Sequence, residues 1–134
     1  MRLSDMRKRK VVLAAALFIV LHGSIAQAVV VNRPAAGTGW ITGNSVTTEV
    51  DFPTPHPYRV VITITNTASP SIEYFSHTDA PYTSAWPYSL NFLVPSNGTN
   101  EPMNCTLTAT GQNFNGTANG AASQAITIKP STNG

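Results

Sequence analysis

Few side chains in this 134-residue chain are of the types that carry out catalysis, and they do not form a set. Cys105 is the only cysteine, and it alternates with Thr in "CTLTAT", so we expect a buried small side chain and not a nucleophile. His77 and Asp79, with Glu73 nearby, come closest to a metal cluster, but a zinc site needs three or four convergent protein ligands. The sequence therefore predicts no catalytic residue, no metal and no cofactor.

The stretch "DAPYTSAWPYS", residues 79–89, offers binding chemistry instead. Its Tyr82 and Trp86 fall in a predicted loop, where aromatic rings can stack on a sugar or anchor a protein partner. The alternative is that Trp86 closes the open end of a hydrophobic core, because large aromatics usually find burial. Trp40 presents the same choice. We predict Tyr82, Trp86 and Trp40 as candidate ligand-binding residues.

Three Asn-x-Thr sequons lie at Asn97, Asn104 and Asn115. In a eukaryotic secreted protein each is a candidate glycan site on an outward or loop position. In an Asn- and Thr-rich bacterial protein the same triplets arise from composition, and the sequence favours a bacterial source without deciding it.

The N-terminus predicts export. The basic stretch "MRKRK" is followed by an apolar run of eleven residues from Val11 to Leu21 and by "AQA" at 26–28. This is the pattern of a cleaved signal peptide, and the run is too short for a membrane-spanning helix, which needs about 20 residues. We predict a signal peptide at 1–28, a single domain at 29–134, and a secreted, extracellular or periplasmic location without membrane insertion.

The charge of the mature chain argues against nucleic acid. The whole sequence has a net charge of +2, but most of its basic residues lie in the predicted signal peptide. Residues 29–134 contain three basic residues and five carboxylates, a net charge of −2. Without a basic patch, a protein lacks the main source of affinity for phosphates.

Alternation of apolar and polar residues predicts strands from Ser45 onward. The inward sets that we expect are Val46, Thr48, Val50 and Phe52; Tyr58, Val60, Ile62 and Ile64; Tyr88, Leu90, Phe92 and Val94; Met103, Cys105, Leu107 and Ala109; and Ile126 and Ile128. In 71–77 we favour Ile72 and Tyr74 inward, because the other choice buries Glu73. With 29–32 and 39–42 counted as one irregular strand, about seven strands predict an all-β sandwich.

The last forty residues resemble the closing hairpin of an immunoglobulin-like domain. They contain an inward Cys105, the alternation "CTLTATG", a Gly- and Asn-rich loop and a final strand "QAITIKP", which are similar to the F and G strands. On this resemblance, 58–66 is the B strand and 71–77 the C strand. No cysteine stands near Ile62, and Met103 occupies the place of the tyrosine corner. The resemblance is therefore to disulfide-free modules of bacterial extracellular proteins and implies an antiparallel β-sandwich.

Together these features predict a non-catalytic structural or adhesive module with a protein partner or self-association. It would be a surface or filament subunit in which the segment 29–42 pairs with a neighbour's sheet edge. The alternative function is a carbohydrate- or protein-ligand-binding module that uses Tyr82 and Trp86. A small hydrolase using His56, His77, Asp79 and Cys105 is the weakest alternative.

Overall fold

The computed structural model describes residues 28–131. The predicted signal peptide lies outside this range except for Ala28. The described residues form eight strands: β1 (Val30–Arg33), β2 (Thr38–Ile41), β3 (Ser45–Asp51), β4 (Arg59–Asn66), β5 (Glu73–Asp79), β6 (Tyr88–Leu93), β7 (Met103–Gln112) and β8 (Ala118–Lys129). In this part of the chain, no helix is long and apolar enough to span a membrane.

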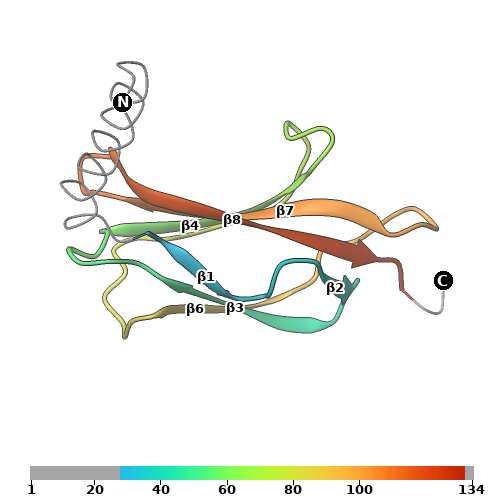
Figure 1. Cartoon of the computed structure of the whole chain (residues 1–134), viewed down its shortest axis with the longest axis horizontal. Coiled ribbons are helices and arrows are strands. Elements are labelled where there is room, and N and C mark those ends of the chain that lie inside the picture. Colours follow the sequence, from blue (N-terminus) through green and yellow to red (C-terminus); the bar gives the residue numbers. More distant parts are fainter. Residues whose placement is uncertain (1–27, 132–134) are drawn as a thin grey trace, which may run out of the picture.

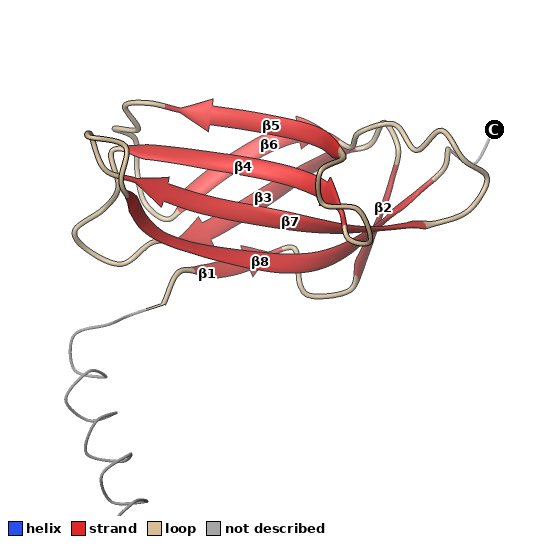
Figure 2. Ribbon diagram, turned by 90° about the horizontal axis from the view of Figure 1, so that it is seen from above, coloured by secondary structure: helices blue, strands red, loops and turns tan. Residues whose placement is uncertain are grey.

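The strands form two facing sheets, as Figure 1 shows edge-on. One sheet has the order β1-β3-β6, and the other has the order β2-β8-β7-β4-β5. The broad face of the larger sheet is seen in Figure 2. All pairings are antiparallel except that of β2 with β8, which is parallel. The prediction of an all-β sandwich is confirmed.

The space between the sheets is filled by side chains that period two predicts, except that Tyr58 lies half-buried in the loop before β4 and contacts the exposed Phe114. Fully or almost fully buried are Val50, Phe52, Val60, Ile62, Ile64, Tyr88, Val94, Cys105, Leu107, Ala109, Ile126 and Ile128. Thr48 is the buried polar member of the predicted inward set, and its hydroxyl donates a hydrogen bond to the Arg33 carbonyl oxygen at 2.8 Å. Cys105 is buried, and this burial raises the pKa of its thiol. The thiol therefore stays in its less reactive, protonated form.

The prediction that 58–66 is the B strand and 71–77 the C strand is wrong. β4 pairs directly with β7, from Arg59 opposite Gln112 to Asn66 opposite Cys105, whereas the B and F strands of an immunoglobulin-like domain lie in opposite sheets. β3 occupies the B position, and β4 and β5 occupy the C and C′ positions. Alternation fixes the face on which a residue lies, but it does not identify the neighbouring strand.

The favoured inward face of 71–77 is only partly right: Tyr74 packs against the core, but Ile72 is 47% exposed and Phe75 also faces inward. Phe75 lies opposite the buried Ile64, so it faces inward and stacks on Phe92 of the other sheet with ring centroids 4.5 Å apart. The pairing with β4 has an irregularity between Ile64 and Thr65, which places Glu73 opposite Thr65. A bulge changes the alternation by one residue. It therefore lets Phe75 face the core while Glu73 stays exposed.

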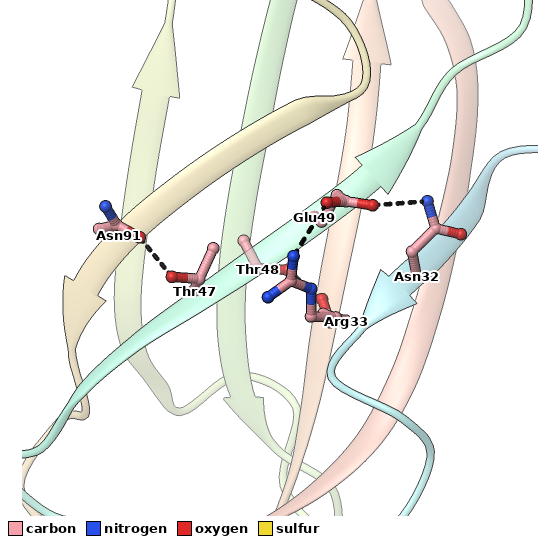
Figure 3. A network of polar contacts seen from close by, with 6 residues as sticks. All are labelled: Asn32, Arg33, Thr47, Thr48, Glu49 and Asn91. Carbon is pink, nitrogen blue, oxygen red and sulfur yellow. Dashed lines mark hydrogen bonds and ion pairs between the residues drawn. The ribbon is translucent and has the colours of Figure 1, made fainter.

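The segment 29–42, predicted to pair with a neighbour, is paired within its own chain. β1 joins β3 in the smaller sheet, and β2 joins β8 in the larger one. Figure 3 shows how polar contacts fasten β1: Asn32 Nδ2 donates to Glu49 at 3.1 Å, and Arg33 forms an ion pair with Glu49 at 3.3 Å. The segment thus forms one edge strand of each sheet, and its pairing with a neighbour stays a prediction.

Candidate functional site at the aromatic end of the sandwich

Three loops meet at one end of the sandwich, on the left in Figure 1. They are the β3–β4 loop (52–58), the β5–β6 loop (80–87) and the β7–β8 loop (113–117). Strand pairing brings the ends of these strands together: Arg59 pairs with Gln112, Val60 with Asp79, and Val50 with Tyr88. These loops hold every Phe, Trp and Tyr that lies outside a strand within residues 28–131. We call this surface the aromatic end, formed by Phe52, His56, Tyr58, Tyr82, Trp86 and Phe114.

Trp86 lies at the centre of this cluster and is half-buried. Its ring stacks on His56 with centroids 4.2 Å apart, and it makes edge contacts with Phe52 at 5.8 Å and Tyr82 at 4.8 Å. Phe52 belongs to the core, whereas His56 is exposed. Trp86 thus packs against the core residue Phe52 and also contacts the exposed His56, while its role in ligand binding stays a prediction.

Tyr82 is held in place through both its side chain and its backbone. Its hydroxyl donates to the Ala85 carbonyl oxygen at 2.6 Å within the same loop, and its backbone N–H donates to the Tyr58 carbonyl oxygen at 3.0 Å. The second bond ties the β5–β6 loop to the β3–β4 loop. The relative positions of Trp86 and His56 are therefore fixed by backbone as well as ring contacts.

A second pair of rings extends the surface. Phe114, 76% exposed, lies edge-on to Tyr58 at 5.0 Å. The Arg59 guanidinium lies 5.6 Å from the Tyr58 ring centroid and donates to the Gln112 side chain at 3.2 Å. Phe114 is the most exposed large apolar side chain of the described residues. This part of the aromatic end thus offers an apolar ring to solvent beside a cation.

Polar contacts lie beneath the rings. The buried Tyr88 hydroxyl donates to the Asp79 carboxylate, and His77 Nε2 lies 3.3 Å from the other carboxylate oxygen. Burial, followed by the hydrogen bond and the negative charge of Asp79, raises the pKa of Tyr88 far above its usual range. Burial and the Asp79 charge also raise the pKa of Tyr82. Both phenols thus remain protonated hydrogen-bond donors.

A small pocket opens beside the rings. Its volume is about 260 Å³, and it is lined by Ala28, Asp51, Phe52, Pro53, Thr54 and His56. Pockets for drug-sized ligands usually span roughly 300–1,000 Å³, so this one suits a single ring or a short side chain. Asp51 offers a hydrogen-bond acceptor and Thr54 a hydroxyl next to the His56 edge of the cluster.

The geometry separates the residues of the hydrolase alternative. His77 and Asp79 meet, but Cys105 pairs with Asn66, at the opposite end of β4 from Val60, the partner of Asp79. Six residues of strand separate these positions by about 20 Å. Within residues 28–131, no group of three or more His, Cys, Asp and Glu side chains is arranged to hold a metal ion.

The remaining predicted site residues lie elsewhere. Trp40 is 8% exposed and contacts Phe92 edge-on at 5.6 Å, so its ring belongs to the core near the opposite end. Asn97 is only 6% exposed, contrary to the outward position expected of a sequon, and its amide nitrogen donates to the Glu101 and Ile128 carbonyl oxygens, each at 2.8 Å. Asn104 and Asn115 are exposed as expected.

Sequence reasoning identified Tyr82 and Trp86 but missed His56, Tyr58 and Phe114 as members of the same surface. These residues lie in three loops, separated by as many as 58 positions in the chain. Successive strands of a sandwich run in alternating directions, so every second connection lies at the same end. Counting the predicted strands would therefore have placed these three loops together.

Comparison with known proteins supports the fold. The structure is similar to that of a fibronectin(III)-like module of Clostridium thermocellum CbhA. The TM-score is 0.50 and the sequence identity 13%, and the match covers 77% of this chain and 98% of that chain. The fold is that of a fibronectin(III)-like β-sandwich. No protein-family model matches the sequence, and no curated protein is significantly similar to it. At this level of identity the likeness concerns the fold alone.

Proposed function

We propose that the protein is an exported, non-catalytic binding module that captures a carbohydrate at its aromatic end. The observation that carries this proposal is that all loop-borne Phe, Trp and Tyr side chains of residues 28–131 gather at one end, around a fixed Trp86. The opposite end has polar loops without aromatic rings. Core packing does not account for the whole cluster, because Phe114 is 76% exposed and is not among the hydrophobic residues that pack against the core.

Carbohydrate suits the chemistry of this end. The apolar C–H faces of a sugar pack on aromatic rings, while its hydroxyls need the acceptors and donors that Asp51, Thr54 and His56 place in the adjoining pocket. The pocket takes one ring-sized group, and the half-exposed Tyr58 with the exposed Phe114 extends the contact surface. The predicted export signal and the net charge of −2 for residues 29–134 also suit an uncharged extracellular ligand.

Glycan-array screening of the purified chain, followed by calorimetric titration of the best ligand, tests the proposal. His56→Ala and Phe114→Ala remove exposed rings with little loss of packing and should each weaken binding about tenfold, or about 1.4 kcal/mol. Ile72→Ala is the matched control, because Ile72 is 47% exposed and lies in the β4–β5 turn at the opposite end. Absence of glycan binding, or equal affinity in all three variants, would contradict the proposal.

A further inference from the structure

The free edge of β6 lacks the features that usually protect an edge strand. β6 pairs with β3 over six consecutive positions without a bulge, and no other strand of the described residues pairs with it. Tyr88–Leu93 contains no charged residue and no proline, and Leu93 is 65% exposed. Natural edges are commonly protected by charges, prolines, bulges or short length. β1 and β2 have only four residues each, and β5 has a bulge and two carboxylates.

We propose that two copies of this chain pair antiparallel through the free edges of β6, in a register centred on Asn91. This self-association goes beyond the proposed carbohydrate binding and does not depend on it. The β6 edge is a different surface from the rings of the aromatic end.

The flanking prolines determine the centre of the register. Pro87 and Pro95 lie four residues on either side of Asn91, so a two-fold axis at Asn91 keeps both prolines at the ends of the paired stretch. A register centred on Leu90 would bring Pro87 opposite Leu93 and lose a ladder hydrogen bond. An axis between two residues would place the inward Leu90 opposite the outward Asn91, which period two disfavours.

The unpaired backbone groups suit the same register. The N–H and C=O of Val94 both bond to residues 43 and 44, on the β3 side of the strand. Because these groups alternate along a strand, those of Ser89, Asn91 and Leu93 point to the free edge. In the Asn91-centred register these three residues face Leu93, Asn91 and Ser89 of the second copy. The pairing would form about six main-chain hydrogen bonds.

Side chains complete the match. On the inner face, the half-buried Leu90 of each copy would lie opposite Phe92 of the other, covering apolar surface at the open side of the sandwich. On the outer face, Asn91 lies beside Thr47, whose hydroxyl bonds to it (Figure 3). The two Asn91 residues would face each other without charge. The same arrangement of β5, centred on Ser76, would set Glu73 against Asp79, a repulsive pair.

Disulfide trapping in a Cys105→Ala background tests the register. Asn91→Cys should cross-link two copies under mild oxidation, because directly opposed residues have Cα atoms about 5.5 Å apart, within disulfide range. Ser89→Cys is the matched control on the same exposed face. Its two copies would lie about 14 Å apart, so it should not cross-link. Cross-linking of Ser89→Cys but not of Asn91→Cys would overturn the register.

A charge swap tests the interface without oxidation. Light scattering should show that the wild-type dimer population falls at least tenfold in both Asn91→Lys and Asn91→Asp, because like charges then face each other. An equal mixture of the two variants should restore dimers. Both changes are at an exposed position, so circular dichroism should show an unchanged fold. A wild-type chain that stays monomeric at millimolar concentration, or Asn91→Lys dimers as abundant as wild type, would overturn the proposal.

Discussion

Tyr88 joins the two sheets at the level of single residues. Its side chain is fully buried on β6, its hydroxyl bonds to Asp79 on β5, and its ring contacts Tyr82 at 4.8 Å. β5 and β6 belong to different sheets. The Tyr88–Asp79 bond is therefore a polar link across the sandwich, directly beneath the rings of the aromatic end.

This link predicts a loss of stability in alkali. The folded state raises the pKa of Tyr88, whereas in the unfolded chain a tyrosine ionises near pH 10. The stabilisation is therefore fully present below about pH 10 and is lost as the pH rises above it, because the unfolded state then releases a proton that the folded state keeps. Tyr82 acts in the same direction.

Urea unfolding between pH 7 and pH 11 checks this prediction. Tyr88→Phe should lower the free energy of unfolding at pH 7 by about 1 kcal/mol, because one hydrogen bond is lost, and should flatten its decline above pH 10. Asp79→Asn keeps an acceptor but removes the charge, so its decline should be intermediate. The same steep decline in Tyr88→Phe as in the wild type would refute the assignment to Tyr88.

At the level of elements, Gly111 on β7 allows the β3–β4 loop to pack closely against that strand. A Cβ atom at this position would lie 2.9 Å from both Cβ and Cγ of Pro57 and 3.1 Å from Cε1 of Phe52. Both neighbours are buried ring side chains that cannot easily move aside. The absence of a side chain on one strand thus allows the loop that carries His56 to pack closely.

Gly111→Ala should therefore lower the free energy of unfolding by about 1–3 kcal/mol and weaken ligand binding at the aromatic end, because the loop must shift outward. Gly98→Ala is the matched control, since a Cβ there meets nothing within 4 Å. Chemical denaturation and titration with the ligand of the wild-type protein measure the two effects. If the two alanine variants were equally stable, the packing argument would fail.

The strands differ in how far their sequences predict them. Alternation correctly oriented β3, β4, β6, β7 and β8, because each has one face in the core and one in water. It could not assign β4 to its sheet, because pairing depends on residues distant in the chain. For β5 it identified Tyr74 but missed Phe75, because a bulge opposite Ile64 and Thr65 shifts the alternation.

The candidate site was predictable only in part for the same reason. Tyr82 and Trp86 lie four residues apart in one loop, so the sequence itself brings them together. His56 and Phe114 lie in two other loops, and these reach the same end only because of the strand order: β3–β4 and β5–β6 cross between the sheets, and β7–β8 is a hairpin. Trp40 looked equivalent to Trp86, but the pairing of β2 with β8 directs its ring into the core.

For the molecule as a whole, the N-terminal segment 29–43 fastens one sheet to the other. It contributes buried Val31 to the smaller sheet and buried Trp40 to the larger one, and Pro34 at the crossing is also buried. Gln124 Nε2 on β8 donates to the Pro34 carbonyl oxygen at 3.0 Å. Cys105, the only cysteine, is free, so this packing takes over the role that a cross-link between sheets has in other sandwiches.

A chain that begins at Asn44 should therefore be unfolded or nearly so. Loss of the Trp40 side chain alone should lower the free energy of unfolding by about 3–5 kcal/mol, and a typical domain has a total of only about 5–15 kcal/mol. A synthetic peptide of residues 29–43 should bind this truncated chain and restore its folded circular dichroism. The intact chain should not bind the peptide at micromolar concentration, because its own tethered segment competes at an effective concentration of about millimolar. Fluorescence polarisation of labelled peptide separates the two cases. Equal binding to both chains would show that the segment exchanges freely between neighbours, and assembly would then not need the β6 edge.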